Sequence, residues 1–257
     1  MPFAPYPLDP ARLQALAARY QNHRPPTVSY ATVRDFCDSV GHMPELASIN
    51  RDLKDAQRPW ALKSILGRVP PGGRLLEIGA GDPHVAHCLS LLGYDVWIVD
   101  PYEGYATGPT DFEYYRDHFP RIHFHRALFS DTLEALAPHS FDAIYSISVM
   151  EHVPHSALGG VIDGIKRFLK PGGLTIHAVD HVLQGAGQAF HLGTLRTMGI
   201  GLGLVPDAVD AMLAAATTDT ETYFLSAEAH NMWRGALPYD QFPMRRCISA
   251  QYVVALS

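Results

Sequence analysis

The sequence contains few cysteines, and they form no recognisable pair. Only Cys37, Cys88 and Cys247 occur among 257 residues, far apart and without a C-x-x-C motif. Such spacing excludes a disulfide framework and a zinc knuckle. Cys88 falls on an apolar helix pattern, where a thiol acts as a small hydrophobic group. We therefore expect a protein of a reducing compartment, and the cytoplasm is the default prediction.

Long hydrophobic runs and basic runs are also lacking. The opening MPFAPYPLDP has no basic region and no long apolar stretch, so we expect no signal peptide. The glycine-rich stretch 198–205 is too short to cross a bilayer. The formal net charge is −6, with no run of lysine or arginine that would capture a nucleic-acid backbone. Neither a membrane nor a nucleic acid is an expected partner.

The order of helix and strand patterns indicates an α/β fold. Helical patterns fill most of residues 1–70, up to the break Pro70-Pro71-Gly72-Gly73. Strands then alternate with helices, which predicts a Rossmann-like, doubly wound, mostly parallel sheet with helices on both faces. We expect a helical N-terminal cap over 1–70 and a Rossmann-like domain over 71–257, whose last part is specific to the substrate. The expected strands are 75–78, 95–99, 122–128, 141–148, 174–179, 222–225 and 248–255, and the expected helices include 44–66, 83–92, 131–136, 155–169 and 207–216.

The stretch RLLEIGAGDPHVA, residues 74–86, is typical of a strand that leads into a nucleotide-binding turn. Gly79 and Gly81 fit the G-x-G start of two fingerprints, but Pro83 and His84 stand where a third glycine belongs. Asp82 is the expected N-cap of the next helix, and its carboxylate would repel a phosphate. A nucleoside without phosphates, such as S-adenosylmethionine, suits this turn better than a dinucleotide.

Four segments together resemble class I S-adenosylmethionine-dependent methyltransferases: LLEIGAGDP, WIVDP, FDAIYSISVMEHVP and FLKPGGLTIHAVD, within about residues 70–180. The resemblance implies S-adenosylmethionine as cofactor and S-adenosylhomocysteine as product. It implies a methionine-binding first motif, a ribose-binding acid after the second strand with a proline beside the adenine, a pair flanking the adenine, and a pair near the methyl group. The matching residues are, in that order, Glu77, Gly79, Ala80 and Gly81; Asp100 and Pro101; Leu128 and Phe129; Ile147 and Ser148.

Three histidines fall where the family places its substrate cleft. His181 follows Asp180 at the end of the fifth strand and is the first candidate for a general base; alternatively, it is a hydrogen-bonded loop residue. His152 belongs to an E-H pair that is often structural in the family, and His230 precedes Asn231 in the C-terminal section. No H-x-x-x-H spacing supports a metal site, and we expect none.

The predicted function is methyl transfer to a small molecule, at oxygen or nitrogen rather than carbon, by direct displacement. A non-catalytic nucleoside-binding subunit that assists a partner is the alternative in another class. An NAD-dependent oxidoreductase is the second alternative, against which Asp82 and His84 count. A homodimer is expected. Residues 187–203 form either a mobile lid or a plain loop around a short helix. The identity of the acceptor is not encoded in any motif of residues 181–257.

Overall fold

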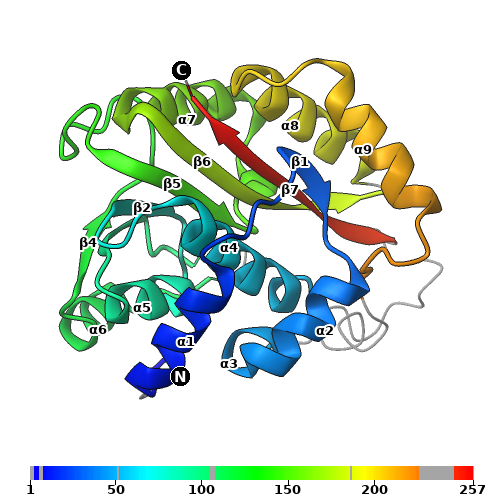
Figure 1. The fold of residues 1–257 in the computed structure, drawn as a ribbon. Coiled ribbons are helices and arrows are strands. Elements are labelled where there is room, and N and C mark those ends of the chain that lie inside the picture. The colour runs from blue at the N-terminus through cyan, green and yellow to red at the C-terminus, as the bar shows by residue number, and fades with distance from the viewer. Residues whose placement is uncertain are drawn as a thin grey trace.

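The computed structural model describes residues 3–5, 8–50, 52–104, 108–185, 187–225 and 246–256. These residues form a seven-stranded sheet with helices on both faces (Figure 1). In chain order the elements are α1 (Pro10–Tyr20), β1 (Val28–Tyr30), α2 (Val33–His42), α3 (Pro44–Ala47), α4 (Lys54–Arg68), β2 (Arg74–Ile78), α5 (His84–Leu91), β3 (Asp95–Asp100), α6 (Phe112–His118), β4 (Ile122–Arg126), β5 (Phe141–Ile147), the 3₁₀ turn η2 (Met150–His152), α7 (His155–Phe168), β6 (Leu169–Val182), α8 (Gln188–Gly201), α9 (Asp207–Thr218) and β7 (Cys247–Ala255).

The strand order of the sheet places a switch point beside β2. The order is β1-β7-β6-β5-β2-β3-β4, and neighbours from β6 to β4 are parallel. The chain runs from β2 outward through β3 to β4 and then returns to β5 on the other side of β2. In such sheets, ligands bind outside the carboxyl ends of the strands at this reversal. The predicted Rossmann-like fold is confirmed, and its switch point lies between β2 and β5.

Alternating strand residues fill two hydrophobic cores, one on each face of the sheet. Leu75 belongs to the core shared with α1, α4 and α5, and Leu76 to the core shared with α7, α8 and α9. Figure 1 shows these helices on opposite sides of the sheet. Helix α4 is buried from Asp55 to Gly67, so even its polar residues lie inside the molecule. That burial brings polar side chains of α4 toward the carboxyl edge of the sheet.

The N-terminal section departs from the prediction at two places. Strand β1, which was not predicted, pairs with β7 in antiparallel fashion through Ser29 and Gln251, whose side chains also hydrogen-bond at 3.0 Å. The helix expected over 44–66 is broken into α3 and α4. The break follows from Asp55, whose Oδ1 accepts the backbone N–H groups of Ile49 and Asn50 at 3.1 and 2.9 Å, and so holds a loop.

Further along the chain, three more expectations need correction. Residues 131–136 form turns instead of a helix, because Gly164 of α7 packs directly on the backbone of Ser130 and Asp131. The strand expected over 222–225 is reduced to isolated bridges from Thr222 and Phe224. The stretch 187–203 is largely the helix α8, which packs on β6.

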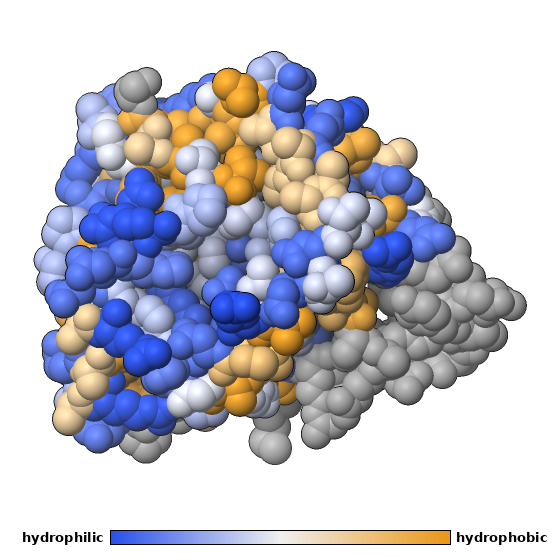
Figure 2. All heavy atoms as spheres, turned by 45° about the vertical axis from the view of Figure 1, so that its right-hand side comes forward, coloured by the Kyte–Doolittle hydropathy of each residue, from blue (hydrophilic) through white to orange (hydrophobic). Residues whose placement is uncertain are grey.

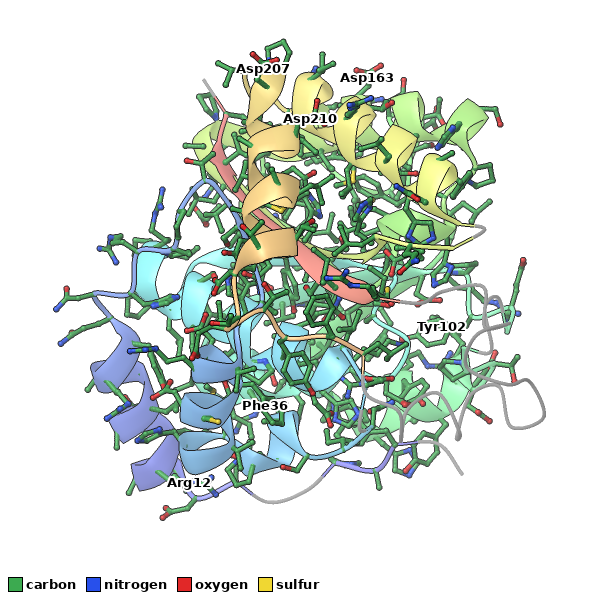
Figure 3. The ribbon with its side chains drawn as sticks, turned by 90° about the vertical axis from the view of Figure 1, so that its right-hand side faces the viewer. Arg12, Phe36, Tyr102, Asp163, Asp207 and Asp210 are labelled. Carbon is green, nitrogen blue, oxygen red and sulfur yellow. The ribbon has the colours of Figure 1, made fainter. Side chains whose placement is uncertain are left out.

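A ring stack and an ion pair are among the contacts that hold α8 to its neighbours. The ring of His155 in α7 stacks on Phe190 of α8 with centroids 4.4 Å apart. Arg196 of α8 donates to both carboxyl oxygens of Asp210 in α9 at 2.9 Å, and Asp210 is labelled in Figure 3. Residues 187–203 therefore form part of the helical layer rather than a detached loop.

The surface over α8 and the following turn is rich in exposed hydrophobic side chains. Phe190, Ile200 and Val205 are 41%, 61% and 70% exposed. Figure 2 shows hydrophobic side chains gathered toward the top of this face, where Figure 1 places α8 and α9. Within the described part of the chain, no helix combines the length and the apolar character needed to span a membrane.

Candidate active site

A left-handed residue follows each of the three central strands at the carboxyl edge. Gly79 after β2 has φ +65°, Tyr102 after β3 has φ +50°, and Ser148 after β5 has φ +54°. Side chains disfavour this region, and such residues gather at sites where the backbone must turn sharply around a ligand. Figure 3 faces this edge and labels Tyr102 there. Left-handed residues therefore follow all three central strands at the carboxyl edge of the sheet.

The carboxylate of Asp100 fixes the glycine turn. Its Oδ2 accepts the N–H of Gly81 at 2.9 Å, and its Oδ1 accepts the N–H of Tyr102 at 2.7 Å. The Tyr102 hydroxyl donates in turn to the carbonyl of Gly81 at 3.3 Å. Each carboxylate oxygen has a second lone pair, so these bonds leave Asp100 able to accept from a ligand. Asp100 thus connects the end of β3 to the turn after β2.

The predicted N-cap role of Asp82 is wrong. Helix α5 begins at His84 with Pro83 in the cap position and without a side-chain cap hydrogen bond. The Asp82 carboxylate instead accepts the hydroxyl of Tyr115 in α6. The tertiary contact with α6 outweighs the local preference of Asp for a cap, because Tyr115 is fully buried and its hydroxyl needs an acceptor. The argument that Asp82 repels a phosphate at this helix end loses its basis.

A buried glutamate lies beneath the turn. Glu77 in β2 is 3% exposed and accepts the Tyr145 hydroxyl at 2.8 Å. Burial raises the pKa of Glu77 to about 8, while Tyr145 and the positive charge of Arg58 oppose the rise. Arg58 of α4 is itself buried, donates to Asn50 Oδ1 at 2.6 Å, and has a pKa lowered by that burial. The guanidinium of Arg58 therefore lies near the carboxyl groups of Asp52, Asp55, Asp82 and Glu77.

A second group of buried polar residues lies at the ends of β5 and β6. Gln57 of α4 is fully buried and its Nε2 donates to Asp180 Oδ1 at 2.7 Å. Glu151 in η2 is 4% exposed, and neither of its carboxyl oxygens has a hydrogen-bond partner among the described residues. Burial, followed by the negative charge of Asp180, raises the pKa of Glu151 to about 8, partly offset by the polar groups of Ser148.

The structure describes two of the three predicted histidines, His181 and His152. His181 is 2% exposed on the opposite face of β6 from the Asp180 carboxylate, because consecutive strand residues alternate in direction. Its Nδ1 has no partner among the described residues, and burial lowers its pKa to about 4. His152 in η2 keeps an exposed side chain and also has a pKa lowered by desolvation. His230 lies outside the described residues.

The residues expected around the adenine are split between core and surface. Phe129 is buried and packs on Phe168 with ring centroids 5.9 Å apart, whereas Leu128 is 75% exposed. Pro101 and Ala80 are partly buried, and Ile147 is 9% exposed at the end of β5. Their assignment to the cofactor stays a prediction.

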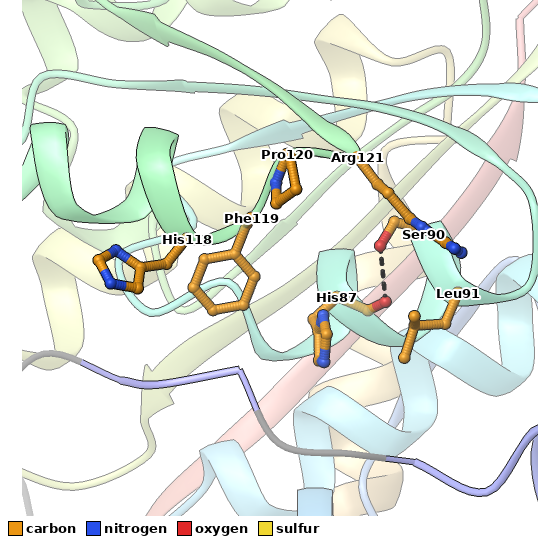
Figure 4. Close-up of a pocket in the computed structure, with 7 residues that line it drawn as sticks. All are labelled: His87, Ser90, Leu91, His118, Phe119, Pro120 and Arg121. Carbon is orange, nitrogen blue, oxygen red and sulfur yellow. Dashed lines mark hydrogen bonds between the residues drawn. The ribbon is translucent and has the colours of Figure 1, made fainter.

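A separate pocket of about 150 Å³ lies between α5 and the segment after α6, away from the glycine turn (Figure 4). The Ser90 hydroxyl donates to the carbonyl of His87 at 2.8 Å beside it. Its lining residues are His87, Ser90, Leu91, His118, Phe119, Pro120 and Arg121. None of these belongs to the predicted site. Among the residues that the model describes, no three His, Cys, Asp or Glu side chains are grouped to hold a metal ion.

Sequence reasoning missed Gln57, Arg58, Tyr102 and Tyr145. The available signal was the polar pair Gln57-Arg58 directly before Pro59. Charged residues are almost never buried without a partner, so polar residues in a helix that is buried all round indicate a site. The burial itself could be recognised only once the position of α4 under β5 and β6 was known.

Comparison with known proteins identifies the class. A family model described as a methyltransferase domain matches residues 50–201, more than half of the chain, and the chain belongs to this family. The match begins within the predicted N-terminal cap and includes α4. The protein is accordingly a class I S-adenosylmethionine-dependent methyltransferase. A search of curated proteins finds no match.

Solved structures share the fold at low sequence identity. A protein assigned as a sarcosine dimethylglycine methyltransferase from Galdieria sulphuraria is 18% identical with a TM-score of 0.52, covering 78% of this chain and 85% of its own. The geranyl diphosphate C-methyltransferase from Streptomyces coelicolor A3(2) is 14% identical with a TM-score of 0.50, covering 98% of this chain and 100% of its own. That structure contains Mg²⁺, geranyl diphosphate and S-adenosylhomocysteine.

Proposed function

We propose that this enzyme transfers a methyl group from S-adenosylmethionine to a small-molecule acceptor at the carboxyl edge between β2 and β5. The observation that carries the proposal is the glycine turn at the switch point, which Asp100 fixes through Gly81 and Tyr102. The two similar structures act, by their names, on sarcosine or dimethylglycine and on geranyl diphosphate, which supports a small acceptor here.

The residues at this edge fit the charges of the cofactor. S-adenosylmethionine carries a positive sulfonium, a positive amino group and one carboxylate. Glu77, Asp100, Glu151 and Asp180 supply negative or polarisable oxygens, and Arg58 supplies the one guanidinium that reaches this edge from α4. Gln57 Oε1 is a buried acceptor without a partner among the described residues, and it is suited to accept a hydrogen bond from the amino group of the cofactor.

When bound, the cofactor supplies a methyl group on a positively charged sulfur, which a nucleophile displaces directly. The chain then has to hold the acceptor in line and keep water out. Asp100 is assigned to the ribose, with Pro101, Leu128 and Phe129 on the adenine side. Gly79, Ala80, Gly81 and Glu77 form the wall on the methionine side, and Ile147 and Ser148 lie on the methyl side.

An acceptor hydroxyl or amine must also lose a proton, and transfer to oxygen or nitrogen is the preferred reaction. His152 is proposed on the acceptor side. His181, the first candidate, faces away from the Asp180 carboxylate, and His230 lies outside the described residues. His181 is neutral at pH 7 because burial lowers its pKa to about 4, so it can accept a proton but is a weak base. His152 has a more exposed ring and is the other nitrogen base near Asp180.

Calorimetric titration tests the proposal. The protein is titrated with S-adenosylhomocysteine and, in parallel, with NAD. Binding of the first with a micromolar Kd and no binding of the second is the expected result. Binding of NAD alone would support an oxidoreductase. Absence of methyl transfer to any of a panel of amines, alcohols and carboxylates, despite tight binding, would favour a non-catalytic subunit.

The proposal also covers the role of the N-terminal section and the oligomeric state. We propose that residues 1–70 act as the cap over this edge, because Gln57 and Arg58 reach it from α4. The homodimer stays a prediction; the exposed hydrophobic side chains over α8 offer a surface for it. Sedimentation equilibrium at micromolar concentrations would show a mass of one or two chains.

A further inference from the structure

Glu151 is buried without the hydrogen bonds that a carboxyl group with a purely structural role would have. It is 4% exposed, and neither oxygen has a hydrogen-bond partner among the described residues. Buried polar atoms nearly always have partners, so two orphan oxygens on one side chain require a reason. Glu151 comes three residues after Ser148, on the methyl side of the proposed cofactor site.

A second carboxyl group and a second orphan atom lie beside it. Asp180 of β6 is near enough to Glu151 for its charge to disfavour ionisation of Glu151, and it is held by the amide of Gln57 at 2.7 Å. The other end of that amide, Gln57 Oε1, has no partner among the described residues although Gln57 is fully buried. Within the described part of the chain, three buried oxygen atoms thus have no hydrogen-bond partner.

The two carboxyl groups differ in their hydrogen bonds. Asp180 accepts a hydrogen bond from Gln57, whereas neither oxygen of Glu151 has a donor among the described residues. A carboxyl group that is buried without donors beside a like charge favours its protonated form. Glu151 therefore holds the proton in the free protein. Among the described residues, the other titratable or charged groups about the pair are Asp52 and Lys54 at the start of α4, His152 in η2, His191 in α8 and Cys247 in β7.

We propose that Glu151 loses its proton when the positively charged cofactor binds, and that the ionised Glu151 then accepts the proton of the methyl acceptor. This inference rests on the proposed function. The positive sulfonium favours a negative charge close to it, and Asp180 and Gln57 position the pair. On transfer, the bonding electrons of the carbon–sulfur bond stay on sulfur. A lone pair of the acceptor oxygen or nitrogen forms the new bond to carbon. The bond between that atom and its hydrogen breaks with its electrons left on the atom, and the proton goes to a Glu151 oxygen and later to solvent.

The product gives a matched ligand for the test, because S-adenosylhomocysteine differs from S-adenosylmethionine only by the methyl group and its charge. The experiment measures the Kd of both ligands between pH 6 and 8 by calorimetry, in buffers of different ionisation enthalpy. For the wild-type protein we expect the affinity ratio of S-adenosylmethionine to S-adenosylhomocysteine to rise with pH, by up to about tenfold per unit for one proton released. A ratio independent of pH would overturn the proposal.

Variants identify the group that releases the proton. Glu151→Gln should abolish the pH dependence of the ratio while the variant still binds S-adenosylhomocysteine. Asp180→Asn, a second variant, should move the pH dependence to lower pH, because it removes the like charge beside Glu151. Glu113→Gln, which changes an exposed carboxyl group of α6 outside the site, should leave the pH dependence of the ratio in place. Loss of that dependence in Glu77→Gln or His181→Gln, with its retention in Glu151→Gln, would assign the proton elsewhere.

Failure of this inference and failure of the proposed function give different results. If S-adenosylhomocysteine does not bind at any pH, the cofactor assignment itself fails. If it binds and the ratio is flat, only the role of Glu151 fails. Thermal unfolding of each variant confirms that the compared proteins are folded.

Discussion

At the scale of single residues, the site depends on a few side chains whose surroundings oppose their usual chemistry. Glu77 and Glu151 are carboxyl groups that burial keeps protonated near neutral pH, and Asp100 uses both oxygens to hold backbone N–H groups. Buried carboxyl groups cost stability unless they are protonated or paired. We attribute their presence at one edge to the proposed ligand binding and not to folding.

Replacing Gly79 should be costly for two separable reasons. An added Cβ would lie 2.8 Å from Val149 Cγ2, and the backbone has φ +65°. We expect Gly79→Ala to destabilise the protein by roughly 2–4 kcal/mol in urea unfolding, of which the left-handed backbone accounts for about 1–2 kcal/mol. Gly72→Ala is the matched control, since Gly72 has φ +79° and open space around it. Equal losses in both variants would exclude a steric role for Val149.

Asp100→Ala should weaken S-adenosylhomocysteine binding by at least about tenfold, or 1.4 kcal/mol. The change removes the acceptor assigned to the ribose and also frees the N–H groups of Gly81 and Tyr102. Asp95→Ala, at the opposite end of β3, should leave the affinity unchanged. Calorimetry on folded protein decides, and an unaltered Kd for Asp100→Ala would remove the ribose assignment.

The raised pKa of Glu151 predicts a pH-dependent stability. Its folded value of about 8 lies above the unfolded value of 4.5, so unfolding releases a proton between these pH values and rising pH favours unfolding. Glu151→Gln should therefore stabilise the free protein increasingly from pH 5 to 8, by at most about 1.4 kcal/mol per pH unit. Urea titrations at three pH values measure this gain. The exposed Glu113→Gln should show no such trend, and a flat difference for Glu151→Gln would contradict the raised pKa.

At the scale of elements, close packing decides which local preferences are realised. Helix α7 packs on the turn at Ser130 and Asp131, and Gly164 permits the approach. Residues 131–136 have a helical pattern, but this contact holds them in turns. The segment between α3 and α4 is likewise governed by Asp55, whose bonds to Ile49 and Asn50 stabilise a loop where the pattern predicted one continuous helix.

Substitution by Ala at two glycines of α7 should change the stability of the protein in opposite directions. At Gly164 a Cβ would lie 2.8 Å from the carbonyl carbon of Ser130, whereas at the exposed Gly159 nothing lies within 4 Å. Gly164→Ala should destabilise by roughly 1–3 kcal/mol through overpacking. Gly159→Ala should stabilise by about 0.5–1 kcal/mol through helix propensity. Thermal melts of the two variants measure both effects, and destabilisation of equal size would show that α7 is held differently.

At the scale of the whole molecule, the N-terminal section is built into the domain that follows it. Helix α4 is buried from Asp55 to Gly67, and its Trp60 and Ile65 share a core with Leu75 and Ile176 of the sheet. Strand β1 adds the edge of the sheet next to β7. A cap built in this way cannot open without exposing the main core.

We therefore expect one cooperative unfolding unit for the N-terminal section and the sheet. Hydrogen exchange in low urea should give the backbone amides of α4 the same opening free energy as those of β2 and β5, within about 1 kcal/mol. The exposed first turn of α1 serves as the internal reference for local opening. Opening of α4 at a clearly lower free energy would show that residues 1–70 unfold separately.

The sequence by itself determined the fold class and the position of the glycine turn, because strand–helix alternation and turn residues are local properties. It predicted the ribose-binding role of Asp100. It also located Glu151 and Asp180 within the family motifs, but not their burial or their proximity. Only the tertiary structure decided that α4 carries Gln57 and Arg58 to the site, that Asp82 binds Tyr115 instead of capping α5, and that His181 faces away from Asp180. The physical reason is that hydrogen bonds and pKa values depend on which groups burial brings together, and those groups come from distant parts of the chain.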